Sequence, residues 1–325
     1  MTTIDGKARG RWTAADVPDQ SGRTAVVTGA SGGLGLQTAR VLAGRGATVV
    51  LACRDLGKAE QAAELIRDQA GRDSVAIVHL DLASLVSVRQ AADDIRAACP
   101  RLDLLINNAA VMAAPYHRTE DGFEATFATN HLGHFALTGL LLSRLLETPG
   151  SRIVTVSSVG HRDGVMHFDD LQFSRGYNRG HAYWQSKLAN LLFTYELSSR
   201  LQAVGAPTTA LAAHPGVVGS TGLWRTSSRL ERVVVSPRMR MINFRLVHSV
   251  EQGALPMLRA ATDPAARAGQ YYGPGGRRGY TGYPVLEESS PRSRNEADQR
   301  RLWQVSEELT GVSYRIRTAP PGGAA

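Results

Sequence analysis

The sequence predicts one α/β domain built on a doubly wound, mostly parallel sheet of about seven strands with helices on both faces. Short apolar runs alternate with segments of helical periodicity along most of the chain. The first apolar run leads directly into a glycine-rich turn and a helix. Polar side chains follow several of these runs, at the sheet edge where folds of this class bind ligands.

The chain of 325 residues can bury a large core, which favours a single domain. Residues 1–22 show no sustained periodicity and are expected to form an N-terminal lead-in. The domain is expected over 23–290, with a substrate loop or lid near 217–248, and a C-terminal extension over 291–325.

The composition does not indicate a nucleic-acid-binding protein. The net charge is +8, but only Lys7, Lys58 and Lys187 among the 37 basic residues are lysines, so the charge reflects a preference for arginine. We therefore expect no nucleic-acid partner. Cys53 and Cys99 form no disulfide framework and no CxxC pair, which favours a reducing compartment and argues against structural zinc.

No targeting or membrane-spanning segment is recognisable in the sequence. Residues 1–20 contain no apolar signal core, and the longest uncharged apolar run, near 133–143, is about half the roughly 20 residues that a membrane span needs. We expect a soluble cytoplasmic protein.

The first strand is expected over residues 24–28, followed at once by Gly29-Ala-Ser-Gly-Gly-Leu-Gly35 and a helical pattern. Glycines permit a tight turn, close approach of a pyrophosphate, and helix packing on the strand, while the helix N-terminus offers free N–H groups. An ordinary tight loop is the alternative, but this position favours a dinucleotide site of the Rossmann type. We assign to the cofactor the turn residues Gly29, Ser31, Gly33, Leu34 and Gly35.

The second strand, residues 47–54, ends in Arg54. An acidic residue there would bind the ribose 2′-hydroxyl of NAD, whereas an arginine suits the 2′-phosphate of NADP. We therefore predict NADP(H). Asp55 follows and either caps the next helix or, if it turns inward, weakens this preference.

The alternation continues with a helix over 55–70, a strand over 75–80, a helix over 84–98 and a strand over 102–107. Asp81 and Leu82 follow the third strand, where a carboxylate can bind the adenine amino group or cap the helix after it. Asn107-Asn108-Ala109-Ala110 follow the fourth strand. Side-chain amides at this end of a strand suit either a cofactor wall or a structural network. We expect the stretch to contact the adenosine-side ribose, and we assign Asn108 and Ala109 to the cofactor.

A long helix is expected over 120–146, with its phenylalanines and leucines packed on the sheet. Asn130 lies in its middle, an unfavourable place for asparagine. His131 and His134 are three residues apart, but no nearby cysteine or carboxylate completes a metal site, so we expect none.

The fifth strand, residues 152–158, ends in two serines, and the segment 159–182 resembles a loop packed by its own aromatic side chains. The helix expected over 181–204 carries Tyr183 and Lys187 on one face, because residues four apart lie one turn apart. A nearby ammonium favours the phenolate, as a general acid/base requires.

A sixth strand is expected over 207–213, and the turn after it supplies the assigned cofactor residues Pro215, Gly216 and Val218. Residues 219–248 mix apolar side chains with arginines, which favours a lid over the active-site mouth; the alternative is a membrane-binding surface over 223–246.

The chain then continues with a helix over 249–262 and a last strand with tight turns over 271–284. A helix near 294–309 follows, with Leu302, Trp303 and Leu309 able to dock.

These residues together resemble the short-chain dehydrogenases/reductases (SDR) over about residues 22–285. The resemblance rests on TGASGGLG, Asp81, Asn107-Asn108-Ala109, Asn130, Ser158, Tyr183xxxLys187 and Pro215-Gly216. Ala52-Cys53-Arg54, Asn130-His-Leu-Gly-His-Phe135, the long Ser–Tyr interval and Lys187-Leu-Ala-Asn190 are similar to the retinol dehydrogenase and WW-domain oxidoreductase branch. NNAA here replaces the usual NNAG, and the N-terminal anchor of many retinol dehydrogenases is not seen.

The resemblance implies an enzyme in which Tyr183 exchanges a proton with the substrate oxygen while a hydride passes to or from the nicotinamide. With NADP(H), which Arg54 favours, we expect carbonyl reduction to be the preferred direction. Lys187 would lower the pKa of Tyr183 and hold the nicotinamide ribose. Ser158 would hydrogen-bond the substrate carbonyl, since Ser157 alternates to the other face of the strand. Asn130 would anchor a water, and homodimers or homotetramers would pair through the helices carrying Asn130 and Tyr183.

The apolar lid and the few charges near the catalytic strand ends suggest a lipophilic ketone, aldehyde or alcohol as substrate. Three alternatives stay open. A nucleotide-binding regulator without catalysis would be marked by loss of the Tyr/Lys pair, which is present. A sugar-nucleotide epimerase or dehydratase would have different glycine spacing. A peripheral membrane enzyme would dock through 223–246.

Overall fold

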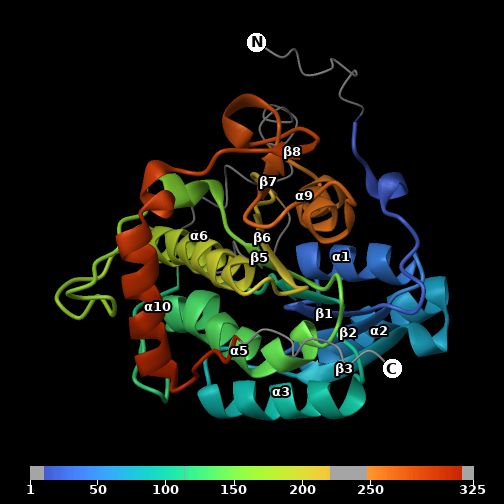
Figure 1. Cartoon of the computed structure of the whole chain (residues 1–325), viewed down its shortest axis with the longest axis horizontal. Helices are drawn as coiled ribbons and strands as arrows, with labels where there is room; N and C mark the ends of the chain where they lie inside the picture. The colour runs from blue at the N-terminus through green and yellow to red at the C-terminus, as the bar shows by residue number, and fades with distance from the viewer. Residues whose placement is uncertain (1–10, 113, 220–246, 317–325) are drawn as a thin grey trace.

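The computed structural model describes residues 11–112, 114–219 and 247–316. Most of the predicted lid, and the predicted membrane-binding alternative at 223–246, lie outside these residues. The predicted fold class is confirmed by what is described: one Rossmann-like α/β domain with a mostly parallel sheet (Figure 1).

Within the described residues the sheet has eight strands, in the order β3-β2-β1-β4-β5-β6-β7-β8. All neighbouring strands are parallel except β7 and β8. The strand order reverses between β1 and β4, as in doubly wound folds. The strands are β1 (Thr24–Thr28), β2 (Thr48–Cys53), β3 (Val75–His79), β4 (Leu104–Asn107), β5 (Arg152–Val156), β6 (Thr209–Ala213), β7 (Tyr271–Pro274) and β8 (Pro284–Leu286).

The prediction of about seven strands was short by one. β8 has only three residues and pairs antiparallel to β7, with Gly273 opposite Val285. A run this short has no readable alternation, and its pairing depends on the turn at 275–283 that brings it back to β7.

Helices cover both faces of the sheet (Figure 1). On one face lie α1 (Gly33–Ala43), α2 (Leu56–Ala70) and α9 (Val250–Thr262); on the other lie α3 (Leu85–Ala98), α5 (Gly133–Leu146) and α6 (Arg179–Ala203). α10 (Glu296–Thr310) packs outside α6 and α5. Short turns complete the elements: η1 (Ala14–Asp16), η2 (Arg72–Ser74), α4 (Ala125–Phe127), η3 (Ala128–Leu132), η4 (Val159–Arg162), η6 (Arg277–Gly279) and η7 (Pro291–Arg294).

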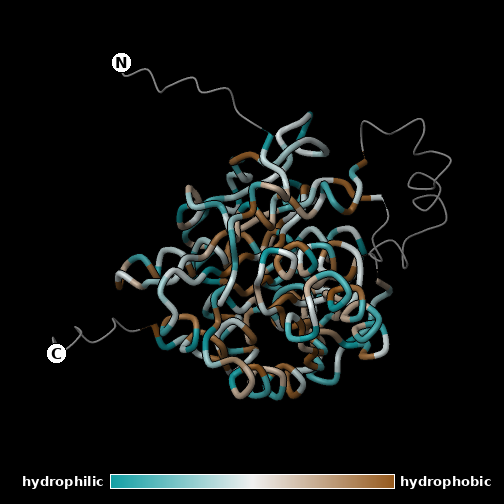
Figure 2. Tube along the Cα trace, turned by 90° about the vertical axis from the view of Figure 1, so that its right-hand side faces the viewer, coloured by the Kyte–Doolittle hydropathy of each residue, from teal (hydrophilic) through white to brown (hydrophobic). Residues whose placement is uncertain are grey.

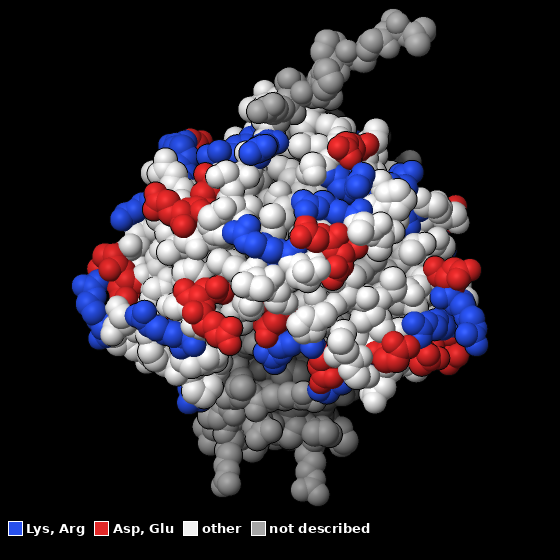
Figure 3. All heavy atoms as spheres, turned by 90° about the horizontal axis from the view of Figure 1, so that it is seen from below, with Lys and Arg blue, Asp and Glu red and all other residues white. Residues whose placement is uncertain are grey.

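The core consists of two main apolar clusters, one on each face of the sheet. The inner strands are buried on both faces and read as continuous apolar runs, as expected where helices cover both sides. Apolar segments concentrate inside the body of the molecule in Figure 2. On the face seen in Figure 3, basic and acidic side chains are interspersed, so it has no uniform positive field for a phosphate backbone.

The single helix predicted over 120–146 is not observed as such. Glu124 ends a short bridge to Arg118, caps α4 with its carboxylate, and accepts from the N–H groups of Thr126 and Phe127. The backbone then widens into the π-helical turn η3 before α5 begins at Gly133. Asn130 lies within η3, so its unfavourable position coincides with a local change of helix type, a feature found frequently at functional sites.

α6 is buried on nearly all sides, with every residue from Gln185 to Ser198 inside the protein. α10 supplies the outer cover: Trp303 is 2% exposed and contacts Phe193 and Phe135, and the Arg200 guanidinium lies 4.3 Å from the Trp303 ring centre. The predicted docking of Leu302 and Trp303 is confirmed. α10 therefore covers part of the surface of α6, which is one of the two helices expected to pair between subunits.

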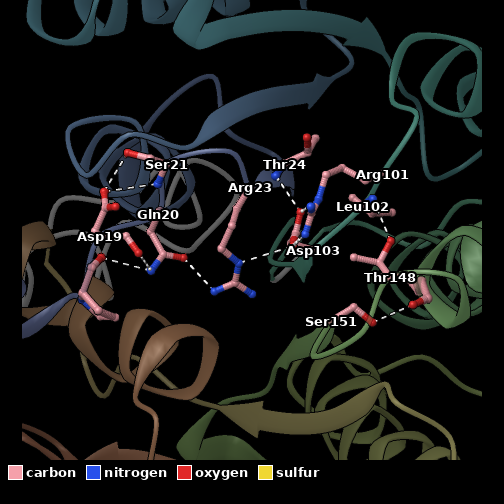
Figure 4. A network of polar contacts seen from close by, with 12 residues as sticks. Asp19, Gln20, Ser21, Arg23, Thr24, Arg101, Leu102, Asp103, Thr148 and Ser151 are labelled. Atoms are coloured by element: carbon pink, nitrogen blue, oxygen red, sulfur yellow. Dashed lines mark hydrogen bonds and ion pairs between the residues drawn. The ribbon is translucent and has the colours of Figure 1, made fainter.

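The amino-terminal edge of the sheet is closed by a polar network around Asp103 (Figure 4). Asp103, 2% exposed, accepts from both Arg101 and the backbone N–H of Thr24, and Arg23 adds a longer contact of 3.4 Å. Burial alone would raise the pKa of Asp103, but these hydrogen bonds and charges outweigh it and hold the pKa below its ordinary value. This network joins β1 to β4 at the end of the sheet opposite the ligand-binding edge.

Candidate active site

A cleft of about 500 Å³ opens at the carboxyl ends of β1 to β5. All predicted cofactor residues line it except Gly216 and Val218. The lining residues are Gly29, Ser31, Gly32, Gly33, Leu34, Gly35, Ala52, Cys53, Arg54, Asp55, Lys58, Leu80, Asp81, Leu82, Asn108, Ala109, Ala110, Val111, Thr129, Val156, Ser157, Tyr183, Lys187 and Pro215.

The glycine turn forms the floor of the cleft. Gly29 has φ +65°, a backbone conformation that disfavours other residues, and a Cβ on it would lie 2.9 Å from Ala109. A Cβ on Gly35 would lie 2.6 Å from the side-chain nitrogen of Asn108. α1 then starts at Gly33 without a side-chain cap, so its first N–H groups are available to an anionic group in the cleft.

Thr28 at the end of β1 holds this turn against β4. Its hydroxyl oxygen accepts from the backbone N–H groups of Asn108 and Ala109, at 2.9 and 3.0 Å. It also lies 2.9 Å from Nε2 of His134, and the side-chain amide of Asn108 donates to the Thr28 carbonyl at 2.8 Å. Sequence reasoning did not single out Thr28. Its position as the last strand residue before the glycine turn was the available signal.

The outer end of the cleft carries both signs of charge. Arg54 is 70% exposed and its guanidinium lies 3.9 Å from the carboxylate of Asp81, which also accepts from the N–H of Ala83. Asp55 caps α2 by accepting from the N–H of Lys58 and forms an ion pair with the Lys58 ammonium. The carboxylate of Asp55 is thus already paired with Lys58.

Asn107 does not lie where it was expected. Its side chain is buried and donates to Thr138 and Thr155, at 2.9 and 3.4 Å, so it points away from the cleft. Alternation explains the error: Asn107 is the last residue of β4, and the next residue, Asn108, faces the opposite way and lines the cleft.

Tyr183 and Lys187 lie side by side on the wall of the cleft, one helical turn apart on α6. Nζ of Lys187 is 5.8 Å from the Tyr183 ring centre and donates to the Val156 carbonyl at 3.1 Å. Burial lowers the pKa of Lys187 to about 7. Burial also raises the pKa of Tyr183, although a hydrogen bond with Ser158 lowers it in part. Burial, rather than the charge of Lys187, therefore has the largest influence on the pKa of Tyr183, and the expected lowering is not observed.

The two serines after β5 differ in burial and in their partners. Ser158 faces Tyr183, caps η4 and accepts from the N–H of Gly160. Ser157 is buried, and its hydroxyl donates to the Lys187 carbonyl at 2.8 Å, although part of the residue lines the cleft. Ser158 itself lies beside the cleft rather than on its lining, next to the tyrosine hydroxyl.

Asn130 is buried behind the cleft wall. Its amide oxygen accepts from the N–H of Val111 at 2.8 Å, and its nitrogen donates to the Val111 carbonyl and to the Ser186 hydroxyl. The neighbouring His134 contacts the Asn130 carbonyl at 3.1 Å. Asn130 thereby ties η3 to the loop after β4 and to α6, and its predicted role with a water stays a prediction.

The turn after β6 brings Pro215 into the cleft but leaves Gly216 and Val218 behind it. Gly216 has φ +73°, and a Cβ on it would meet the carbonyl of Tyr280. Val218 is buried and bridges to His248. These two residues shape the turn and do not form the cleft surface.

A family model of the short chain dehydrogenases matches residues 23–231. The chain belongs to this family. It is 43% identical over 297 residues to human retinol dehydrogenase 12, covering 90% of this chain and 88% of that protein. It is 44% identical over 296 residues to human retinol dehydrogenase 13, covering 90% and 85%. A crystal structure of an uncharacterized protein from Mycobacterium paratuberculosis matches with 43% identity and a TM-score of 0.77, covering 94% of this chain and 99% of that one.

As a short-chain dehydrogenase of the retinol dehydrogenase branch, the protein is an NAD(P)-dependent oxidoreductase acting on CH–OH groups, interconverting an alcohol and a carbonyl compound. The cleft fits a dinucleotide, since the glycine turn leaves backbone exposed at the uncapped start of α1 and Tyr183 with Lys187 closes the far end. The sequence-based prediction of this family and enzyme class is confirmed.

Sequence reasoning on this dehydrogenase missed Lys58 and Thr129, which also line the cleft. The rarity of lysine was a signal for Lys58 as much as for Lys187, and only Lys187 was singled out. Within the described ranges, no group of three or more histidine, cysteine or acidic residues is arranged to hold a metal. No helix among these residues is long and apolar enough to cross a membrane.

Proposed function

We propose that this dehydrogenase interconverts a lipophilic carbonyl compound and its alcohol with NADP(H), using Tyr183 as the acid/base. The observation that carries the proposal is that Tyr183 lines the same cleft as the glycine turn, has Lys187 beside it and lies close enough to Ser158 for that hydroxyl to lower its pKa. A nicotinamide cofactor bound there supplies or accepts the hydride. In the reducing direction, Tyr183 gives its phenolic proton to the substrate oxygen, so that the carbonyl becomes an alcohol.

Ser158 and Lys187 have separate parts in this proposal. The Ser158 hydroxyl can donate to the substrate oxygen, because it lies close enough to Tyr183 to influence the pKa of the phenol. Lys187, held by the Val156 carbonyl, has remaining N–H groups that can donate to a ribose in the cleft. Its charge then lies where it favours the phenolate form of Tyr183 during proton transfer.

The test is reduction of a panel of carbonyls by NADPH: decanal and retinaldehyde as lipophilic members, acetophenone as an aryl ketone, and glyceraldehyde as a polar member. Tyr183→Phe removes only the hydroxyl and should lower kcat by about 10²- to 10⁴-fold. Tyr314→Phe is the matched control, since its hydroxyl donates to the Phe135 carbonyl away from the cleft. Full activity of Tyr183→Phe would refute the proposed acid/base role.

Support for NADP(H) comes from the outer end of the cleft. Arg54 and Lys58 present two cations after β2, and Asp55 is engaged with Lys58. An exposed guanidinium can rotate from Asp81 onto a ribose 2′-phosphate and bind it with two hydrogen bonds. Comparing kcat/KM for NADPH and NADH on one carbonyl tests this; a preference for NADH would refute it.

Support for a lipophilic substrate comes from the relatives, whose names give retinol, an apolar alcohol, as the compound they act on. In the panel, decanal and retinaldehyde should therefore show higher kcat/KM than glyceraldehyde. The opposite ranking would refute this part of the proposal and leave the reaction class untouched.

Location and assembly are proposals of the same kind. We propose a cytoplasmic enzyme that forms a homodimer or homotetramer through a surface other than α6, because α10 covers that helix. Fractionation of the source cells tests the first point, and membrane recovery would contradict it. Cross-links between the α6 helices of two chains would contradict the second.

A further inference from the structure

Two buried histidines lie directly behind the proposed active site and have no part in the proposed proton transfer. His161 follows Ser158 by three residues in η4, and His214 immediately precedes Pro215, which lines the cleft. Both side chains are fully buried. Each histidine forms one hydrogen bond with a turn that borders the cleft and another with the segment that follows β8.

The contacts of His161 fix which of its ring nitrogens carries the proton. The backbone N–H of Ser290 donates to Nε2 at 3.1 Å, so Nε2 is unprotonated. Nδ1 lies 2.6 Å from the Ser158 carbonyl and therefore carries the proton and donates it. Burial lowers the pKa of His161 to about 4, which keeps this ring neutral. The His161 side chain thus connects the backbone of Ser158 to the segment after β8.

His214 shows the opposite arrangement. The backbone N–H of Gly216 donates to its Nδ1 at 3.3 Å, so the proton lies on Nε2, which donates to the carboxylate of Glu287 at 3.0 Å. Arg162 of η4 also contacts Glu287, at 3.7 Å. The His214 side chain thus connects the Pro215–Gly216 turn to the same segment after β8.

The residues around the two imidazole rings leave room for them, with one aromatic ring between them and glycines where a side chain would overlap His214. Tyr271 of β7 lies between, with the His214 ring stacked on it at 5.1 Å and the His161 ring edge-on at 5.6 Å. Gly273 faces His214 so closely that any Cβ there would overlap Nε2. A Cβ on Gly279 would lie 3.0 Å from the Glu287 carboxylate and 3.2 Å from the His214 ring. β7 and the turn after it therefore omit side chains where the imidazole and its carboxylate lie.

We propose that His161 and His214 are positioning residues with separate tasks: His161 places Ser158 for the substrate carbonyl, and His214 places the Pro215–Gly216 turn for the cofactor. The His161 half rests on the proposed function of Ser158. Neither ring touches the reacting atoms. His161 acts on Ser158, and His214 on the Pro215–Gly216 turn, through one backbone hydrogen bond each. The pair couples the two turns to β7 and β8, the part of the domain farthest along the sheet from the glycine turn.

Asparagine and glutamine separate the two hydrogen bonds of each ring. The side-chain amide of asparagine reproduces the position of Nδ1, and that of glutamine reproduces the position of Nε2. His161→Asn keeps the hydrogen bond to the Ser158 carbonyl and loses the one from the Ser290 N–H. His161→Gln keeps the acceptor for the Ser290 N–H and loses the donor to Ser158. His214→Asn keeps the acceptor for the Gly216 N–H and loses the donor to Glu287. His214→Gln keeps the donor to Glu287 and loses the acceptor for Gly216.

The experiment measures NADPH dissociation constants, kcat for decanal or another panel carbonyl that is turned over, and Tm for all four variants. His161→Gln should lower kcat by about tenfold or more through displacement of Ser158, with NADPH affinity unchanged. His214→Gln should weaken NADPH binding by about tenfold, because the N–H of Gly216 loses its partner. Both asparagine variants should stay near the wild type in these two quantities. Asp103→Asn, at the opposite edge of the sheet, is the control that lowers Tm alone.

Equal loss in the asparagine and glutamine variants, or loss that merely follows Tm, would overturn the proposal. NMR of histidine-labelled wild type gives a readout without turnover: the proton should lie on Nδ1 of His161 and on Nε2 of His214. The same tautomer at both positions would overturn the assignment. If no carbonyl in the panel were reduced, the proposed function would fail, while the NADPH titrations and the tautomers would still decide this inference.

Discussion

Lys187 lies beside Tyr183 with its ammonium 5.8 Å from the centre of the phenol ring, and it donates to the Val156 carbonyl oxygen rather than to a carboxylate. Burial therefore lowers the pKa of Lys187 to about 7, from an ordinary value of 10.5. A cation held in this way is costly for folding and useful for catalysis, because it is uncompensated until a substrate oxygen or phenolate develops charge nearby.

Lys187→Met should therefore abolish activity and raise stability. The folded state holds fewer protons than the unfolded state between pH 7 and 10.5, so the cost of the lysine is complete below about pH 7 and disappears as the pH rises towards 10.5. The Tm gain of the variant should be roughly 5 °C at pH 6.5 and smaller at pH 9.5. Lys58→Met, at a lysine that is 50% exposed, is the matched control without such a gain. A gain that grows with pH would contradict the argument.

Arg54→Ala should lower kcat/KM for NADPH by about 10- to 100-fold and leave kcat/KM for NADH nearly unchanged, since it removes hydrogen bonds to a 2′-phosphate that only NADPH has. Steady-state kinetics on one carbonyl with both cofactors measures this. Arg175→Ala is the control, because Arg175 has similar exposure, 66% against 70%, and pairs with Asp169 and Asp170 outside the cleft. Equal losses for both cofactors would instead indicate a general role of Arg54 in the fold of the cleft.

Local signals were sufficient for the parts of the site that lie within one strand–turn–helix unit. The glycine turn follows its strand directly, and Tyr183 and Lys187 share a helix face by spacing alone. The helix over 120–146 was misread because apolar spacing does not reveal the switch to a π-turn around Asn130.

His161 and His214 escaped notice for a different reason. His161 lies in the short turn η4 and His214 in the loop after β6. Their partners, Ser290 and Glu287, follow 129 and 73 residues later in the chain. Only the return of the chain through β7 and β8 brings them together, and no periodicity in the sequence encodes that contact.

Asp103→Asn should cost about 1 to 3 kcal/mol at neutral pH, because the charge-assisted hydrogen bonds from Arg101 and Thr24 are weakened in a buried place. The folded state lowers the pKa of Asp103, so its contribution is complete above the unfolded value near 4 and is lost as the pH falls through the folded value. Urea unfolding at pH 7 and at pH 3 should therefore show that the difference in free energy of unfolding between variant and wild type is smaller at pH 3. A constant difference would show that the carboxylate charge is not what stabilises this edge.

Trp303→Ala should destabilise the domain by about 3 to 5 kcal/mol, although α10 lies beyond the region that the family resemblance covers. Trp303 fills the space between Phe135, Phe193 and Tyr314, and Tyr314 in turn donates to the Phe135 carbonyl at 2.6 Å. The loss leaves a cavity against α6, the helix that carries Tyr183, so kcat should fall together with stability. Urea unfolding followed by far-UV circular dichroism measures the loss of stability without relying on tryptophan fluorescence. Val86→Ala, at a residue 76% exposed on α3, should change neither quantity. An unchanged unfolding midpoint in Trp303→Ala would mean that the packing of α10 does not stabilise the domain. The outer surface of α6 could then serve for pairing between subunits.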